Sequence, residues 1–175
     1  NYDSVVHASK AITGEFDVLA NLAAYVPKKA DEDLLVESEK VNVQGLVNLL
    51  EAFKGRVGKH IFGSTAEVYD HRLITSPLSI NTTTGPLSYY AATKLSGEHI
   101  ALSYGRKNNV PTIVLRFSVM YGPDDQIARA IPNFIKSAIS NKDINITGGR
   151  AKRDYLHIAD VVESINKAVE SQFDG

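Results

Sequence analysis

A tyrosine and a lysine stand four residues apart in the segment SYYAATKLSGEH, which begins at Ser88. On a helix, residues i and i+4 lie on one face, so Tyr90 and Lys94 would be neighbours, whereas Tyr89 would point elsewhere. A free phenol has a pKa of ~10, and a nearby ammonium favours the phenolate and lowers that pKa. Such a phenol can exchange a proton with a substrate hydroxyl. The pair therefore predicts an acid–base site, in which the lysine could also hydrogen-bond a ribose.

The Tyr-x-x-x-Lys pattern also has a purely structural interpretation. It occurs by chance in many helices, usually as a solvated lysine beside a half-buried ring. The pattern alone favours this structural interpretation, and only further motifs elsewhere in the chain would favour the catalytic one.

Length and composition restrict the class of protein. The 175 residues suit one domain, and the net charge of −1 creates no field that would favour nucleic acid or an anionic membrane. The chain has no cysteine, which excludes disulfides and thiolate chemistry and agrees with a cytoplasmic location. No apolar run approaches the ~20 residues of a membrane span, and the start does not resemble a signal peptide. Both ends resemble cut points, so we expect the middle of a longer protein.

Apolar patterns predict strands and helices that alternate along the chain. This order is typical of an α/β fold, here a partial Rossmann-like, doubly wound parallel sheet with helices on both faces. Strands are predicted for residues 16–24, 58–65, 111–117 and 144–148. Helices are predicted near residues 5–12 and for residues 31–54, 89–106, 127–140 and 160–170. Residues 71–85 are predicted to form a loop and residues 121–125 a turn.

Small or polar residues follow three of the predicted strands, where such sheets bind their ligands. We therefore expect the segments Asn21–Ala24, Ser64–Glu67 and Phe117–Tyr121 to share one edge of the sheet.

Six segments, in order, resemble the extended short-chain dehydrogenase/reductases, in the group of NAD-dependent epimerases and dehydratases related to UDP-glucose 4-epimerase. The segment PLSYYAATKLSGEHIALSY resembles the active-site helix of that family. FDVLANLAA resembles the family's cofactor strand, VNVQGLVNLLEA its Asn-Val-x-Gly-Thr helix and HIFGSTAEVYD its Ser-Ser/Thr strand end. VLRFSVMYGP resembles its Leu-Arg-x-x-Asn-Val-Tyr-Gly-Pro strand, and RDYLHIADVV resembles its Arg-Asp-Tyr segment.

The resemblance implies that residues 1–175 are the central part of one NAD(P)-binding domain, with a substrate-binding portion from about residue 120. Tyr90 would be the acid–base, Lys94 its modulator and ribose ligand, and Thr65, which stands 25 residues earlier, would hold the substrate oxygen. The implied cofactor contacts are Leu22, Ala23, Ala24, Asn42, Ser64, Tyr90 and Lys94, and the implied substrate contacts are Thr65, Glu67 and Arg153.

Most of these assignments have structural alternatives. Thr65 could bond its own backbone at a strand end, and Ala23 and Ala24 could serve strand–helix packing. Asn42 could be a buried helix residue that satisfies a neighbouring loop. Arg153 suits a diphosphate because its fork binds phosphate oxygens bidentately, or it could belong to a solvated basic loop, the interpretation preferred for Arg150 and Lys152. Asp154, His157 and Asp160 are predicted to be structural, and the histidines have no metal-ligand spacing.

The sequence also departs from the family pattern. No Gly-x-x-Gly-x-x-Gly turn precedes FDVLANLAA, so we expect the first βαβ unit, and also the C-terminal part, to lie outside this chain. Leu46 and Asp70 replace the usual Thr and Gly. Ala66-Glu67 stands where dehydratases carry Asp-Glu, which disfavours water elimination, and Val119 replaces an Asn that commonly contacts the substrate diphosphate.

The resemblance thus implies an NAD-dependent nucleotide-sugar epimerase that works through a keto-sugar, with NADP left open and a homodimer as a further implication. One alternative is a reductase, dehydrogenase or decarboxylase for another substrate, which Val119 favours. Another is a protein or fragment without turnover, which the missing first unit favours.

Overall fold

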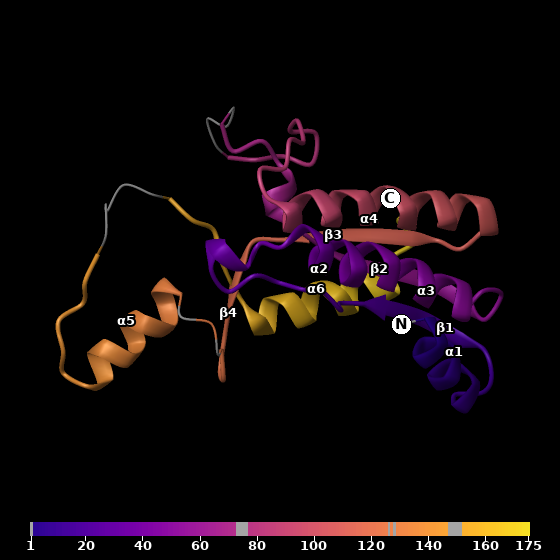
Figure 1. The fold of residues 1–175 in the computed structure, drawn as a ribbon, viewed down its shortest axis with the longest axis horizontal. Helices are drawn as coiled ribbons and strands as arrows, with labels where there is room; N and C mark the ends of the chain where they lie inside the picture. Colours follow the sequence, from indigo (N-terminus) through magenta and orange to yellow (C-terminus); the bar gives the residue numbers. More distant parts are fainter. Residues whose placement is uncertain (1, 73–76, 126, 128, 147–151) are drawn as a thin grey trace.

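Three parallel strands form the main sheet in the computed structural model, which describes residues 2–72, 77–125, 127, 129–146 and 152–175. They are β1 (Phe16–Asn21), β2 (Val57–Thr65) and β3 (Thr112–Phe117), and β2 lies in the middle (Figure 1). Their parallel register brings all three carboxyl ends to one edge. The predicted parallel sheet is therefore confirmed.

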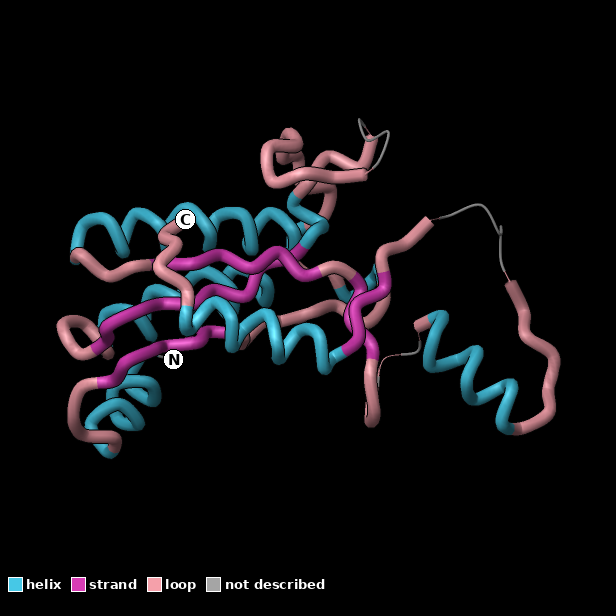
Figure 2. Tube along the Cα trace, turned by 180° about the vertical axis from the view of Figure 1, so that it is seen from behind, coloured by secondary structure: helices cyan, strands magenta, loops and turns pink. Residues whose placement is uncertain are grey.

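Helices cover both faces of this sheet, as the sequence predicts (Figure 2). On one face, α3 (Gly45–Ala52) and α4 (Tyr89–Asn108) pack around Phe62. On the other, α6 (Ile158–Glu170) packs against Ile61. Adjacent residues of a strand point to opposite faces, so β2 supplies both halves of the core. A further helix, α1 (Tyr2–Ala11), contacts α3.

Helix α4 approaches β2 unusually closely because a glycine faces the sheet. A Cβ atom on Gly97 would lie 2.6 Å from Cζ of Phe62, far inside normal contact distance. A second glycine, Gly105, has the same relation to Thr112 of β3, with 2.4 Å to its Oγ1. These two residues let the helix backbone lie directly on the sheet.

A second, two-stranded parallel sheet was not predicted. It consists of β4 (Val119–Tyr121) and β5 (Tyr155–His157), and α5 (Ala130–Ile139) precedes β5 in the chain. The strand predicted for 144–148 is wrong for residues 144–146, which are irregular and exposed; Thr147 and Gly148 lie outside the described residues. Alternating apolar residues form a strand only where a partner strand supplies hydrogen bonds, and β4 pairs with β5 instead.

The helix predicted for residues 31–54 is divided into several segments. A 3₁₀ turn, η1 (Ala30–Glu32), and a short helix, α2 (Leu35–Ser38), lead into the π-helical segment η2 (Glu39–Gln44), which continues into α3. The wider π turn contains Asn42, and such turns often occur at functional sites.

Asn42 connects three parts of the fold. Its Oδ1 accepts a hydrogen bond of 2.7 Å from Tyr25 N, and its Nδ2 donates to Tyr25 O at 3.2 Å and to Thr93 Oγ1 at 3.0 Å. The Thr93 hydroxyl in turn donates to Tyr90 O at 2.8 Å. This buried amide therefore fixes the loop after β1 against the first turn of α4.

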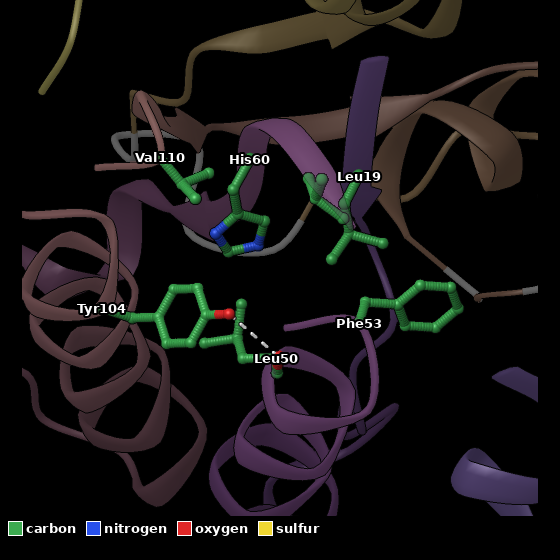
Figure 3. Close-up of a pocket in the computed structure, with 7 residues that line it drawn as sticks. Leu19, Leu50, Phe53, His60, Tyr104 and Val110 are labelled. Carbon is green, nitrogen blue, oxygen red and sulfur yellow. Dashed lines mark hydrogen bonds between the residues drawn. The ribbon is translucent and has the colours of Figure 1, made fainter. Parts of the chain in front are cut away.

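A small cavity of about 10 Å³ lies in the core, with room for about one water molecule. His60 of β2 lines it with Leu50 and Tyr104 from the covering helices (Figure 3). The imidazole is 1 % exposed, and among the described residues neither ring nitrogen has a hydrogen-bond partner. Burial lowers the pKa of His60 from 6.5 to about 4, so the ring is neutral at neutral pH.

Among the described helices, none has both the length and the apolar character that crossing a bilayer requires.

Replacing Asn42 by Ala should destabilise the protein, because the N–H and C=O of Tyr25 lose their partner. Each buried group left unpaired costs about 1–3 kcal/mol, which urea unfolding would measure. Asn48→Ala is the matched control: Asn48 is also a buried asparagine, but its Oδ1 accepts from Gln44 Nε2 within the same helical stretch. Equal losses in the two variants would contradict the assigned role of Asn42.

The buried His60 should make stability fall in mild acid. Its pKa is lower in the folded than in the unfolded state, so the unfolded state binds an extra proton as pH falls from about 6.5 to about 4. His60→Leu should therefore lose less unfolding free energy over this window than the wild type, by up to about 3 kcal/mol. Urea titrations at several pH values measure the difference, with exposed His99→Leu as control. Parallel pH curves for wild type and His60→Leu would contradict this expectation.

Candidate active site

The three predicted segments meet at the carboxyl edge of the main sheet. Asn21, Thr65 and Phe117 are the last residues of β1, β2 and β3, and Thr65 is paired with Phe117. Strand β1 ends at Asn21 rather than at Ala24, because Asn21 Oδ1 accepts from Ala23 N at 3.2 Å and turns the chain.

The residues after β1 were predicted to line the cofactor. Leu22 is 52 % exposed, Ala23 is exposed and Ala24 is half-buried. They form an open surface beside Gly63, where a Cβ atom would lie 2.9 Å from Leu22 Cδ2. Gly63 thus makes room for the Leu22 side chain, and the exposure of Leu22 and Ala23 leaves this surface accessible to a ligand.

The N-terminus of α4 sets the position of Tyr90. The Ser88 hydroxyl caps the helix by accepting from Ala91 N at 3.1 Å. The carboxylate of Asp33 accepts from the backbone N–H groups of Tyr89 and Tyr90, at 2.8 and 2.9 Å. A carboxylate at a helix N-terminus is favourable because these N–H groups have no partner within the helix.

Thr65 lies beside Tyr90, as the sequence resemblance implies. A hydrogen bond between the two hydroxyl-bearing side chains lowers the pKa of Tyr90. Thr65 Oγ1 also accepts from Glu67 N at 3.2 Å and caps the short 3₁₀ turn η3 (Ala66–Val68). The structural interpretation of Thr65 is therefore confirmed, and its catalytic role stays a prediction.

The expected lowering of the Tyr90 pKa by Lys94 is wrong for this structure. Burial raises the pKa of Tyr90, an effect larger than the opposing hydrogen bond from Thr65. The charge of Glu67 raises the pKa further and that of Arg129 lowers it, whereas Lys94 is not among the causes. The phenol is thus protonated at neutral pH, a state in which it can donate a proton.

Lys94 is buried against an aromatic ring. It is 2 % exposed, and its Nζ lies 4.3 Å from the ring centroid of Phe62. Burial lowers the pKa of Lys94 to about 8, and the charge of Glu98 opposes this effect. Among the described residues, no hydrogen-bond acceptor takes an Nζ hydrogen. A buried ammonium with free donors suits the hydroxyl groups of a ribose, so the donor set present here fits NAD.

Ser64 was predicted to contact the cofactor, and the structure gives its hydroxyl another partner. Ser64 Oγ donates to Glu98 Oε1 at 2.5 Å, beneath α4. Asn42 likewise has protein partners for its amide, in agreement with the alternative of a buried residue that holds a loop. If Ser64 and Asn42 have a role in cofactor binding, that role is indirect and acts through the backbone that they position.

The two remaining predicted substrate contacts differ in position. Glu67 is exposed close to Tyr90, whose pKa its charge raises. Arg153 is exposed, and its described contact is a 3.0 Å hydrogen bond to the carbonyl of Lys152. The contacts of the described residues thus do not bring Arg153 to Tyr90, and they agree with the solvated-loop alternative; Arg150 lies outside the described residues.

Arg129 is a site residue that sequence reasoning missed. It is half-buried just before α5, its Nη1 donates to Met120 O at 3.2 Å, and its charge acts on Tyr90. No motif marks it, because a single basic residue before a helix is common.

His157 confirms its predicted structural role. It is the N-cap of α6, where its Nδ1 accepts from Ala159 N at 3.2 Å. Within the described ranges, no group of three His, Asp or Glu side chains is arranged to hold a metal ion.

Comparison with known proteins gives a family. The model of the "NAD dependent epimerase/dehydratase family" matches residues 3–175. An uncharacterized UDP-glucose epimerase of Bacillus subtilis is 36% identical over 126 residues, which are 71% of this chain and 39% of that protein. A dTDP-D-glucose 4,6-dehydratase of Dictyostelium discoideum is 32% identical over 164 residues, 87% of this chain and 38% of that protein.

A solved structure agrees with the sequence relatives. UDP-glucuronic acid 4-epimerase from Bacillus cereus, in complex with UDP-glucuronic acid and NAD, superposes with a TM-score of 0.79 at 28% identity. The match covers 97% of this chain and 53% of that one, so this chain spans about two fifths to a half of the length of these relatives. With a family model that matches nearly every residue, this chain belongs to the NAD-dependent epimerase/dehydratase family.

Proposed function

We propose that the protein containing this chain is an NAD-dependent nucleotide-sugar epimerase. The observation that carries the proposal is the pairing of Thr65 and Tyr90 at the carboxyl edge of the sheet, with the buried ammonium of Lys94 one helical turn away. Two hydroxyl groups from different elements, in contact beside a cation, can hold and protonate one sugar oxygen.

Thr65 and Tyr90 have different roles at the sugar oxygen. The Thr65 hydroxyl orients the sugar hydroxyl, and the Tyr90 oxygen takes its proton as the sugar is oxidised to a ketone and returns it when the sugar is reduced. Because the raised pKa keeps Tyr90 protonated at neutral pH, the phenol is in the state that can donate a proton to a keto-sugar. The base step requires a lower Tyr90 pKa, towards which Thr65 and Arg129 act.

Lys94 and the loop after β1 would hold the cofactor. NAD supplies hydride acceptance and return when it is bound. The Lys94 ammonium would donate hydrogen bonds to ribose hydroxyls, and the exposed backbone of Leu22 and Ala23 would lie along the cofactor. NAD is favoured over NADP because the family is NAD-dependent and solved relatives include complexes with NAD.

The substrate class is inferred from the relatives. Their names include UDP-glucose, UDP-glucuronate and dTDP-glucose enzymes, all of which act on nucleotide sugars. Epimerisation is favoured over dehydration because Ala66 stands beside Thr65 where an acid would be needed to eliminate water. A homodimer and a cytoplasmic location stay predictions, as does a substrate-binding portion that begins near residue 120.

A second candidate is a decarboxylase or reductase of the same family. Val119 favours it, because this residue replaces the amide expected at the diphosphate, and one relative is a UDP-N-acetylglucosaminuronate decarboxylase, 29% identical. Chromatography of the products from UDP-glucose, UDP-N-acetylglucosamine and UDP-glucuronic acid would separate the candidates: an epimer supports the first, and loss of CO₂ or net NADH turnover supports the second.

Tyr90→Phe should lower kcat by a factor of about 10²–10⁴, because an acid–base group typically contributes that much to turnover. Epimer formation from UDP-sugars by the longest natural form of the protein measures the effect. The neighbouring Tyr89→Phe is the matched control, since that ring is 49 % exposed and lies off the Tyr90–Lys94 face. The acid–base role would be wrong if both variants stayed within about tenfold of the wild type.

A further inference from the structure

A buried carboxylate lies one helical turn beyond the candidate site. Glu98 follows Lys94 by four residues on the same face of α4, and the two side chains are only 3 % and 2 % exposed. Carboxylates and ammonium groups are rarely buried so completely unless charges compensate them. The sequence motifs and the proposed mechanism give no role to Glu98.

The contacts of Glu98 fix the orientation of its carboxylate. Arg116 of β3 donates to Oε1 through Nε at 2.9 Å and to Oε2 through Nη2 at 2.6 Å, a bidentate pair. Ser64 of β2 donates to Oε1 as well. Arg116 is itself held, because its guanidinium lies 4.9 Å from the ring centroid of Tyr69. Such planar, two-bond pairs fix direction as well as distance.

Glu98 is also the charge that acts on Lys94. Among the described titratable groups, its carboxylate is the one whose charge raises the pKa of Lys94 and opposes the effect of burial. Without that charge, burial alone would favour the neutral amine, which cannot act as a cation beside Tyr90.

We propose that Glu98 is a positioning residue of the site: its buried carboxylate, oriented by Arg116 and Ser64 one helical turn beyond Lys94, keeps the Lys94 side chain charged. The use of the Lys94 charge in ribose binding and proton transfer rests on the proposed function. The effect of Glu98 on that charge does not depend on the proposed function.

Other charged or titratable groups around this cluster could influence Lys94. Tyr90 lies one turn before it on α4, Arg116 of β3 is paired with Glu98, and the ring of Tyr69, after η3, contacts Arg116. Strand β2 contributes Ser64 and the ring of Phe62, which carry no charge. Glu98 is therefore the one anion in the described surroundings of Lys94 that substitution can neutralise without altering Tyr90.

The test is a direct titration of Lys94 by NMR, with 13Cε-labelled lysine and no substrate. The Lys94 signal is the one that Lys94→Arg removes. Glu98→Gln keeps the shape of the side chain and removes its charge, although its NH₂ group can no longer accept a hydrogen bond where one carboxylate oxygen stood. The pKa of Lys94 should therefore fall by about one unit or more. Ser64→Ala removes one hydrogen bond to the same carboxylate and no charge, and should cause a much smaller change.

A second variant keeps the test valid if Glu98→Gln does not fold. Glu98→Gln leaves the half-buried Arg116 without its counter-ion, whereas Glu98→Gln/Arg116→Gln removes both charges together. The pKa of Lys94 should also fall in the double variant, by less than in Glu98→Gln, because the positive charge of Arg116 is lost as well. An unchanged Lys94 pKa in a folded variant overturns the inference, as does an equal shift in Ser64→Ala.

The pH profile of catalysis supplies a separate readout. Lys94 loses its charge as pH rises through its pKa, so the alkaline limb of kcat/KM should move to lower pH in Glu98→Gln. If Tyr90→Phe stays active while Glu98→Gln still lowers the pKa of Lys94, the proposed function fails and the charge coupling stands. If Tyr90→Phe loses activity but Glu98→Gln leaves the pKa of Lys94 unchanged, the proposed function stands and Glu98 is a packing residue.

Discussion

The close contact between α4 and β2 determines the geometry of the whole site. Gly97 has no Cβ, so the helix backbone can lie over the ring of Phe62 at a distance that a methyl group would block. The same approach places Lys94, one turn before Gly97, over that ring, and Glu98, the residue after Gly97, against Ser64 and Arg116. Protein interiors are packed densely enough that a shift of one methyl group would be transmitted to these side chains.

Burial dominates the electrostatics of the site. It raises the pKa of Tyr90 and lowers that of Lys94, so burial disfavours the charged form of both side chains. The compensating effects come from side chains that the fold brings close: Thr65 at the end of β2 and Arg129 before α5 act on Tyr90, and Glu98, one turn further along α4, acts on Lys94. Groups poised in this way respond strongly to any charge that a ligand brings, a property typical of catalytic sites.

Backbone anchoring completes the arrangement. Asp33 and Ser88 satisfy the free N–H groups at the start of α4, and Asn42 joins the loop after β1 to Thr93 on the same helix. These residues act on the backbone at the start of α4 and not on the Tyr90 ring. They hold the phenol at the sheet edge while the loop of Leu22 and Ala23 stays exposed.

The sequence by itself determined the alternation of strands and helices, the parallel sheet, and the Tyr90–Lys94 pair on one helix face, because these follow from local periodicity and from ordered motifs. It also marked Thr65, since that position closes a strand. Sequence reasoning failed for residues 144–146, which have strand-like alternation but no partner, and for β4 and β5, which are three residues each. Only the tertiary structure decided the pKa directions, the role of Arg129 and the Glu98–Arg116 pair, because burial and charge act between side chains that the fold, rather than the order of residues, brings together.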